Sequence, residues 1–424
     1  MGKAHLLSLG CPKNLVDSER LLRRMSEEGI HYSSSPEDSD IILVNTCGFI
    51  EDAKRESIEE ILKAAALKNK GRRKKLVVFG CLAKRSGEEL RREIPEIDAI
   101  WGVGDDDEIL RFCSQQVKAS PGPGCDRFVE TPYAYLKVAE GCDRACSYCV
   151  IPGIRGPYKS RNPEEVLSEA EAMVRSGRKE LVLVAQDITS YGKDLGGYPL
   201  SRLLGEMASI EGDFRIRLLY LYPAAIDDQL LETIAARDKV CNYIDMPLQH
   251  TESGILKLMG RGGSSGLFRK GIRRIRDIIP DVAIRTTFIV GFPQETEEDF
   301  QAMLEFIEEM QFDRLGAFTY SREEGSSAFR LKGQVPKRMK EARRDRVMEK
   351  QAVISLRRNQ ALLGKTFKAL VDEVDDVGIA RLYSQAPEID GVVFIEAGNI
   401  VKGEFVNVRI TGAYDYDLKG IVEK

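Results

Sequence analysis

Two long stretches of the chain alternate short apolar runs with helical patterns, and this alternation restricts the possible folds more than any other feature. In residues 1–117, apolar runs at 4–10, 40–46, 75–80 and 97–103 are each followed by a stretch of helical periodicity, the third of these at 86–95. A strand–helix–strand order predicts a parallel sheet with helices on its faces. We therefore expect a parallel-sheet α/β domain over residues 1–117.

The second alternating stretch spans residues 128–358. Its six strand-like runs are 134–140, 180–185, 215–221, 242–248, 282–290 and 314–320. Six β/α units predict a partial or complete barrel of the TIM type, with its site at the carboxyl ends of the strands. A long charged helical pattern follows at 337–363, and the Pro-, Gly- and Ser-containing residues 116–131 read as a linker between the two stretches.

The last part of the chain, residues 360–424, changes character. Short strand-like runs at 365–374, 378–383, 391–396 and 404–414 are broken by Gly, Asp and Pro. This pattern predicts a small all-β barrel. The whole chain is thus expected to be α/β with a small β-barrel at its end.

Cysteine usage indicates the kind of chemistry. The chain has nine cysteines and only three histidines. An odd number of cysteines in a chain with no long apolar signal core favours metal or catalytic roles over disulfides, and few histidines favour thiolate ligands. Because no run of about 18 apolar residues exists, we expect no membrane span and a cytoplasmic protein.

Cys142, Cys146 and Cys149 form the most specific motif, C-x3-C-x2-C, directly after a predicted strand. Three thiolates can ligate three irons of a [4Fe–4S] cluster and leave the fourth iron open to a small molecule such as S-adenosylmethionine. Tyr148 is placed to pack on its adenine. The alternatives are a zinc site, which usually needs four ligands, and an electron-transfer cluster, which usually has C-x2-C-x2-C spacing.

Cys11, Cys47 and Cys81 form a second triad by position rather than by spacing. Each follows one of the first three predicted strands. Since parallel strands end at the same edge of a sheet, three thiolates are expected to converge there. A second [4Fe–4S] cluster is the favoured interpretation, and chance burial is the alternative. The other cysteines, Cys113, Cys125 and Cys241, fit neither triad; we expect Cys113 and Cys241 to be ordinary core or surface residues and Cys125 to be exposed.

The segment around Cys142–Cys149 resembles the radical S-adenosylmethionine superfamily. The resemblance implies a (βα)6 partial barrel and cofactor contacts on later strands. Gln186 and Asp187 stand where that family contacts the methionine moiety, and the segments containing His250 and Gly291 resemble those near ribose and adenine. Ordinary strand-end hydrogen bonding is the alternative for these side chains.

The start SLGCPKN, the turn NTCGFI and the segment EGCDRACSYCVIP together resemble the methylthiotransferases along the whole chain. That resemblance implies an N-terminal cluster domain, a radical core at 128–358 and a TRAM-type barrel at 360–424. It further implies two [4Fe–4S] clusters and S-adenosylmethionine, with an external electron donor and sulfur source. No catalytic residue beyond the cluster ligands is expected.

Two substrates compete within that family. One branch, the MiaB type, modifies an adenosine of transfer RNA, and the RimO type modifies the β-carbon of an aspartate in small-subunit ribosomal protein twelve. The start SLGCPKN and the segment AQDIT resemble the RimO type, although Ile188 separates the usual AQD from its Thr.

Charge gives an independent argument on the substrate. Residues 360–424 hold seven Lys and Arg against eleven Asp and Glu. An acidic barrel disfavours a phosphate backbone and suits a basic protein, with 371–376 and 414–417 as candidate contacts; a merely solvated acidic surface is the alternative. We expect the ribosomal protein, free or assembled into the subunit, as partner, with RNA contact left open as a secondary interaction.

Overall fold

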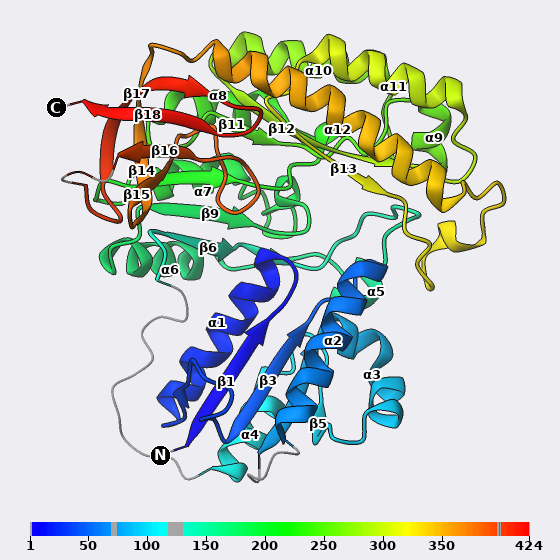
Figure 1. Cartoon of the computed structure of the whole chain (residues 1–424), viewed down its shortest axis with the longest axis vertical. Helices are drawn as coiled ribbons and strands as arrows, with labels where there is room; N and C mark the ends of the chain where they lie inside the picture. Colours follow the sequence, from blue (N-terminus) through cyan, green and yellow to red (C-terminus); the bar gives the residue numbers. More distant parts are fainter. Residues whose placement is uncertain (1, 69–73, 118–129, 397, 399, 424) are drawn as a thin grey trace. The chain divides into compact units, whose positions relative to one another are not determined.

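The computed structural model describes residues 2–68, 74–117, 130–396, 398 and 400–423 (Figure 1). Most of the predicted linker, with Cys125, lies outside the described residues. The chain divides into two compact units. Unit 1 comprises Met1–Glu130, Gly141–Asp143 and Cys149–Pro157, and unit 2 comprises Thr131–Glu140, Arg144–Tyr148 and Tyr158–Lys424. No helix within the described ranges is both long and apolar enough to cross a membrane.

Unit 1 contains a five-stranded parallel sheet in the order β2-β1-β3-β4-β5. Its strands are β1 (Lys3–Ser8), β2 (His31–Tyr32), β3 (Ile41–Thr46), β4 (Lys75–Gly80) and β5 (Ala99–Ile100). The helices are α1 (Pro12–Glu27), α2 (Glu51–Lys68), α3 (Cys81–Glu93), α4 (Asp106–Gln116) and α5 (Ile151–Arg155). All six residues of β3 are buried, as expected for a central strand covered on both faces.

Two boundaries in unit 1 differ from the sequence prediction. Helix α3 begins at Cys81 rather than at residue 86, because Gly80 at φ +97° turns the chain straight from β4 into the helix. A non-helical Ser86 (φ −132°) interrupts α3 at the residue where the periodicity suggested a start. Strand β5 is only two residues long, so the predicted run 97–103 was too long.

The core of unit 2 has six parallel strands in two three-stranded sheets, ordered β10-β9-β6 and β11-β12-β13. Where the two sheets meet, an isolated parallel β-bridge joins Ile216 of β10 to Val240, which precedes β11. The strands are β6 (Tyr133–Lys137), β9 (Glu180–Val184), β10 (Arg215–Leu218), β11 (Tyr243–Asp245), β12 (Ala283–Val290) and β13 (Arg314–Thr319). The predicted α/β partial-barrel class is confirmed.

Helices follow these strands and cover them with one large apolar core. They are α6 (Pro163–Arg175), α7 (Leu200–Ala208), α8 (Asp228–Ala236), α9 (Ser253–Leu258), α10 (Ser265–Ile278), α11 (Glu297–Met310) and α12 (Lys337–Gln360). A separate two-stranded antiparallel sheet consists of β7 (Ala139–Glu140) and β8 (Lys159–Ser160). Helix α11 starts with a complete capping box between Thr296 and Asp299, which satisfies otherwise unpaired amides of its first turn.

A closed barrel, β14-β15-β16-β18-β17, ends the chain. Its strands are β14 (Thr366–Val374), β15 (Val377–Arg381), β16 (Val393–Glu396), β17 (Phe405–Ala413) and β18 (Leu418–Glu423). The sequence predicted the barrel but missed β18, where Lys419 and Gly420 interrupt the apolar alternation. Gly420 lies against Val408 and leaves no room for a Cβ atom, so its role is visible only in the folded barrel.

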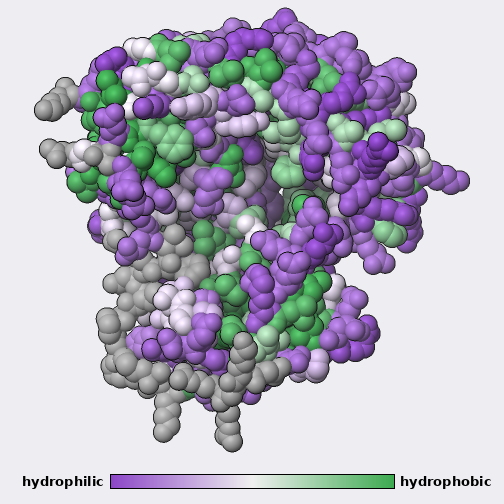
Figure 2. Space-filling view, in the orientation of Figure 1, coloured by the Kyte–Doolittle hydropathy of each residue, from purple (hydrophilic) through white to green (hydrophobic). Residues whose placement is uncertain are grey.

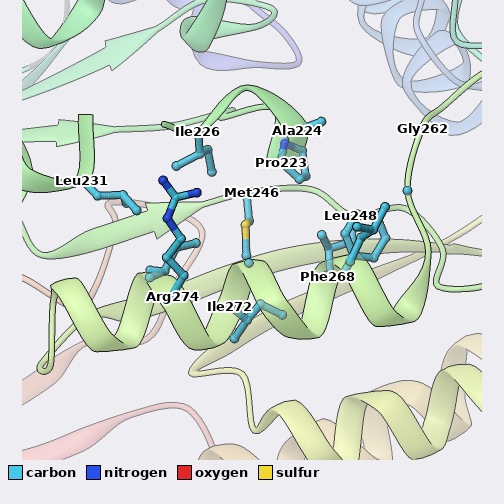
Figure 3. A pocket seen from close by; sticks show the side chains of 14 residues that line it. Pro223, Ala224, Ile226, Leu231, Met246, Leu248, Gly262, Phe268, Ile272 and Arg274 are labelled. Atoms are coloured by element: carbon cyan, nitrogen blue, oxygen red, sulfur yellow. The ribbon is translucent and has the colours of Figure 1, made fainter. Parts of the chain in front are cut away.

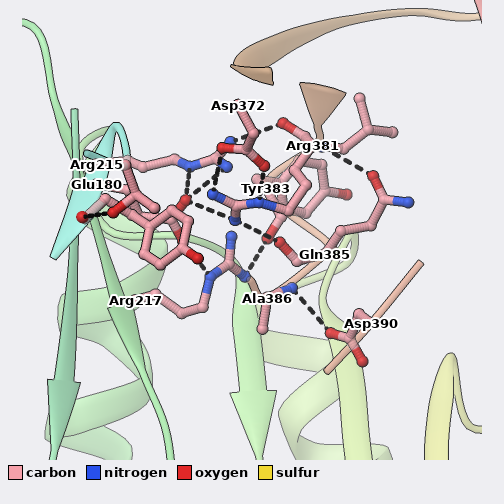
Figure 4. A network of polar contacts seen from close by, with 12 residues as sticks. Glu180, Arg215, Arg217, Asp372, Arg381, Tyr383, Gln385, Ala386 and Asp390 are labelled. Carbon is pink, nitrogen blue, oxygen red and sulfur yellow. Dashed lines mark hydrogen bonds and ion pairs between the residues drawn. The ribbon is translucent and has the colours of Figure 1, made fainter. Parts of the chain in front are cut away.

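A buried ionic network joins this barrel to the core within unit 2 (Figure 4). Glu180, at the start of β9, accepts hydrogen bonds from Arg215 and Arg217 of β10 and from Arg381 of β15. Arg381 also pairs with Asp372 of β14. Burial would raise the pKa of Glu180, but the three guanidinium groups outweigh it and hold that pKa well below its usual range.

Candidate functional site

The carboxyl edge of the unit 1 sheet brings Cys11, Cys47 and Cys81 together. Cys11 precedes α1, Cys47 follows β3 and Cys81 opens α3 directly after β4. Gly10, at φ +88°, approaches so closely that a Cβ atom there would lie 2.8 Å from Cys47 Sγ. The pKa of the Cys47 thiol is raised and that of Cys81 is raised to about 11, mainly by burial and to a smaller extent by the neighbouring Cys11. A metal cluster would therefore bind only when the two buried thiols lose their protons.

Asn14 and Arg155 lie beside Cys81 of this triad, and no sequence pattern pointed to either residue. The buried Asn14 donates from Nδ2 to the carbonyls of Leu9 (2.9 Å) and Thr46 (3.1 Å). Its Oδ1 accepts a hydrogen bond from Arg155 Nη2 at 2.6 Å. The charge of Arg155 favours the thiolate form of Cys81, which opposes the effect of burial. The pair thus fixes the loops that carry the thiols and supplies the local positive charge.

Within the described ranges, no three His, Cys, Asp or Glu side chains are arranged around one metal-ion position. A four-iron cluster does not need such an arrangement, because each thiolate binds a different iron. The donor set in unit 1, three thiols at one sheet edge with no histidine among them, fits that chemistry.

The second triad occupies the loop between β7 and α5. The Cys142 N–H donates to Gly156 O (3.1 Å), and the Ile151 N–H donates to Cys149 Sγ (3.5 Å). Cys146 Sγ lies 3.8 Å from Nη1 of Arg261. Three thiols in one loop, two of them already contacted by N–H donors, suit an iron–sulfur cluster, whose sulfurs are commonly hydrogen-bonded.

Arg261 is the main residue that sequence reasoning missed in unit 2. Besides Cys146 it contacts Tyr148 Oη (3.5 Å) and donates to Pro247 O (2.8 Å), and it lies over the ring of Tyr222. Burial lowers its pKa, but Tyr148 and Cys146 raise it by more, so the guanidinium keeps its charge. Arg261 is 115 residues from Cys146 in sequence, and no motif links the two.

Gln186 and Asp187 lie at the carboxyl end of β9. Asp187 caps a 3-10 turn: its Oδ1 accepts from the backbone and hydroxyl of Thr189, and its Oδ2 accepts from Arg144 Nε (2.9 Å) and Ser190 Oγ (2.9 Å). Gln186 Nε2 donates to Glu140 Oε1 at 3.0 Å. Both side chains therefore take part in strand-end hydrogen bonding, the alternative that the sequence left open.

His250 and Gly291 meet at a buried turn. His250 is fully buried; its Nδ1 accepts from the Glu252 N–H (3.0 Å), and its Nε2 lies 3.5 Å from Glu295 Oε2. The Glu295 carboxylate accepts the Gly291 N–H (2.8 Å) and pairs with Arg343 of α12 at 2.7 Å. The turn after β12 is thus held by a carboxylate between an imidazole and a guanidinium.

An apolar cavity of about 460 Å³ lies in unit 2 between α10 and the segment after β10 (Figure 3). Its lining includes Pro223 and Ala224, directly after Tyr222, and Gly262 and Gly263, directly after Arg261. Met246 and Leu248, at the end of β11, contribute to its wall. The cavity is therefore adjacent in sequence to the residues around Cys146.

Two of the remaining cysteines are buried, in agreement with an ordinary structural role. Cys113, a residue of α4, is completely buried in the apolar core, and burial raises the pKa of its thiol to about 12. Cys241 is buried beside the arginines of the Glu180 network.

Comparison with known proteins defines the class. Residues 3–102 match "Uncharacterized protein family UPF0004", residues 136–307 match "Radical SAM superfamily" and residues 363–422 match "TRAM domain". Among solved structures, the radical S-adenosylmethionine methyltransferase TsrM from Kitasatospora setae aligns with a TM-score of 0.55 at 14% identity, covering 75% of each chain. That likeness concerns the fold. The protein is therefore a radical S-adenosylmethionine superfamily member that also carries UPF0004 and TRAM segments.

Curated relatives narrow the family. "Ribosomal protein uS12 methylthiotransferase RimO" of Thermodesulfovibrio yellowstonii is 54% identical over 98% of this chain and 99% of the relative. The proteins of the same name from Acetivibrio thermocellus and Geobacter sulfurreducens are each 46% identical over 99% of this chain and 98% of the relative. The chain belongs to the RimO family of ribosomal protein uS12 methylthiotransferases.

Proposed function

We propose that this chain is a radical enzyme that adds a methylthio group to the β-carbon of an aspartate in ribosomal protein uS12. The observation that carries the proposal is the full-length similarity, at 54% identity, to a relative named for that activity. Two sets of three thiols support the proposal. One cluster is enough for a radical reaction, so the second set indicates a second cluster that takes part in the transfer of sulfur. The reduced state that these thiols require supports a cytoplasmic location.

In the proposed radical site, Cys142, Cys146 and Cys149 hold one [4Fe–4S] cluster and leave one iron for S-adenosylmethionine. When bound, the cluster and S-adenosylmethionine would supply radical chemistry that activates a carbon–hydrogen bond, using an electron from an external donor. Arg261, a half-buried cation beside Cys146, would bind the methionine carboxylate of the cofactor. Tyr148, held by Arg261, is placed to pack on the adenine.

In the proposed auxiliary site, Cys11, Cys47 and Cys81 hold the second [4Fe–4S] cluster. Asn14 orients the loops, and the positive charge of Arg155 favours the thiolates. This site would deliver the sulfur; the sulfur and the electrons would come from external donors, and a second S-adenosylmethionine would supply the methyl group.

For substrate recognition, we propose that the TRAM-type barrel at 360–424 contacts the basic ribosomal protein. Several of its acids serve the fold, since Asp372 pairs with Arg381 and Asp417 accepts the Val392 N–H. Exposed acids remain: Glu373, Asp375, Asp376 and Asp415. The barrel surface combines hydrophilic and hydrophobic areas (Figure 2). Val377 and Val401 are exposed apolar side chains of the barrel segment, at 47% and 57% exposure. Such a surface suits a basic protein better than a phosphate backbone.

The test uses anaerobically reconstituted protein with reductant, S-adenosylmethionine and either uS12 or transfer RNA. Mass spectrometry is expected to show a methylthio-aspartate in uS12 and no modified nucleoside. A modified nucleoside with an unchanged protein would refute the assignment and favour the adenosine-modifying alternative.

Two single variants test the division of labour. Cys146→Ala should abolish release of 5′-deoxyadenosine, whereas Cys47→Ala should retain it and lose sulfur insertion. Iron analysis should give about eight irons for the wild type and about four for either variant. Equal loss of 5′-deoxyadenosine in both variants would contradict two separate sites.

A further inference from the structure

Tyr222 lies beneath two arginine side chains. It lies four residues after the end of β10 and is half-buried. The guanidinium carbon of Arg144 is 3.8 Å from the centre of its ring, and that of Arg261 is 4.7 Å from the same centre. Both distances fall within the range of cation–π attraction. One aromatic ring therefore offsets the repulsion between two like charges.

The two arginines belong to the loops around Cys146. Arg144 stands between Cys142 and Cys146 in sequence and binds Asp187 Oδ2 at 2.9 Å. Arg261 follows α9 and reaches Cys146 Sγ at 3.8 Å. Tyr222 thus joins three segments of unit 2: the cysteine loop, the end of β10 and the loop after α9.

The backbone fixes the ring in place. Tyr220 has a φ of +66°, a conformation that a bulky residue rarely adopts. The fully buried Asp245 holds it there: its Oδ2 accepts the Tyr220 N–H (2.9 Å), and its carbonyl accepts the Leu221 N–H (2.8 Å). The Tyr222 N–H reaches Thr189 Oγ1, and that hydroxyl donates to Asp187. A side chain held on strand ends in this way can position its neighbours.

We propose that Tyr222 is a positioning residue for the radical site, whose ring keeps Arg261 directed at Cys146 and Arg144 directed at Asp187. The inference rests on the radical-site part of the proposed function. Without the ring, the two guanidinium groups lose their shared partner and separate. Arg261 then no longer presents its charge to a bound carboxylate. The hydroxyl plays no part in this, so phenylalanine should serve equally well.

The test compares three variants of the full chain, each reconstituted with iron and sulfide. Tyr222→Leu removes the ring, and Tyr222→Phe keeps it. Tyr198→Leu is the matched control, because Arg202 lies over the Tyr198 ring at 4.5 Å elsewhere in unit 2. Equilibrium dialysis measures the Kd for S-adenosylmethionine. Electron paramagnetic resonance of the reduced protein records the change that the cofactor causes in the cluster signal.

For Tyr222→Leu we expect a Kd raised roughly tenfold, corresponding to the loss of one or two partly buried cation–π contacts, and a smaller cofactor-induced spectral change. Tyr222→Phe and Tyr198→Leu should stay within about twofold of the wild type on the same scale. Should Tyr222→Leu lose iron, Tyr222→Met replaces it, since it fills similar space without a ring. A wild-type Kd and spectrum in the ringless variant, or an equal loss in Tyr222→Phe, would overturn the inference.

The outcome also separates this inference from the proposed function. A wild type that binds S-adenosylmethionine but leaves uS12 unmodified would refute only the substrate. A wild type that binds no S-adenosylmethionine would overturn the role of Tyr222 together with the radical site.

Discussion

Replacing Glu180 by glutamine should loosen the contact between the core and the C-terminal barrel. The Glu180 carboxylate is completely buried and accepts four hydrogen bonds: from Arg215 Nε (3.0 Å) and Nη2 (2.7 Å), from Arg217 Nε (2.6 Å) and from Arg381 Nη1 (2.8 Å). Glutamine keeps the size but removes the charge and faces the donors with an amide. Removing one partner of a buried ionic network leaves uncompensated charge and costs about 3–5 kcal/mol.

Hydrogen exchange measured by mass spectrometry is the appropriate assay, since a chain of two units need not unfold in one step. Peptides covering β9, β10 and β15 should exchange about 10²- to 4 × 10³-fold faster in Glu180→Gln, the equivalent of that free energy at about 1.4 kcal/mol per factor of ten. Glu206→Gln is the control, because Glu206 forms an exposed pair with Arg202 and should change stability by less than about 0.5 kcal/mol. Equal exchange in the two variants would refute the reasoning.

The pH dependence gives a second check on Glu180. Its pKa is lower in the folded than in the unfolded state, so the unfolded chain binds more protons between the two values. The contribution of Glu180 is therefore fully present above the unfolded pKa of about 4.3 and is lost as the pH falls toward the folded value. The difference between wild type and Glu180→Gln should be constant from neutral pH down to that point and shrink below it. A difference that grew on acidification would contradict the assignment.

Three further predictions concern single residues. Gly80→Ala should destabilise unit 1 and reduce the iron bound at the auxiliary site by about half or more. Gly80 has φ +97°, and a Cβ atom at this position would collide with Asn45 Oδ1. Iron analysis and thermal unfolding measure the two effects, and normal values for both would contradict the prediction. Asp98→Asn should cost about 1 kcal/mol at neutral pH, since hydrogen bonds from Lys68, Lys75 and the Leu76 N–H outweigh burial and lower the pKa of Asp98. Urea unfolding should show a larger difference at pH 7 than at pH 3, and a difference that grew on acidification would contradict the prediction. Thr296→Ala removes one half of the capping box of α11 and should lower the free energy of unfolding by about 1 kcal/mol, measured by urea unfolding. Thr296→Ser keeps the hydroxyl and should be nearly neutral. Equal losses in both variants would show that the cap hydrogen bond is not the cause.

The sequence by itself determined the local features of this protein. Alternation of apolar runs with helical stretches predicted the parallel sheets, because the side-chain period of a strand differs from that of a helix. The spacing of Cys142, Cys146 and Cys149 and the strand-end positions of Cys11, Cys47 and Cys81 marked these thiols as candidate cluster ligands, because both features can be read along the chain. It failed where tertiary packing sets a boundary, as at the start of α3 and in β18.

Only the tertiary structure decided which residues surround those thiols and what joins the core to the barrel. Arg261 is 115 residues from Cys146, Arg155 is 141 residues from Asn14, and Arg381 is 201 residues from Glu180. An isolated arginine carries no periodicity or spacing, and most arginines in a sequence face solvent. Their roles arise because folding places each guanidinium, buried or half-buried, next to particular partners, and in a low-dielectric interior an unpaired charge is too costly to leave there.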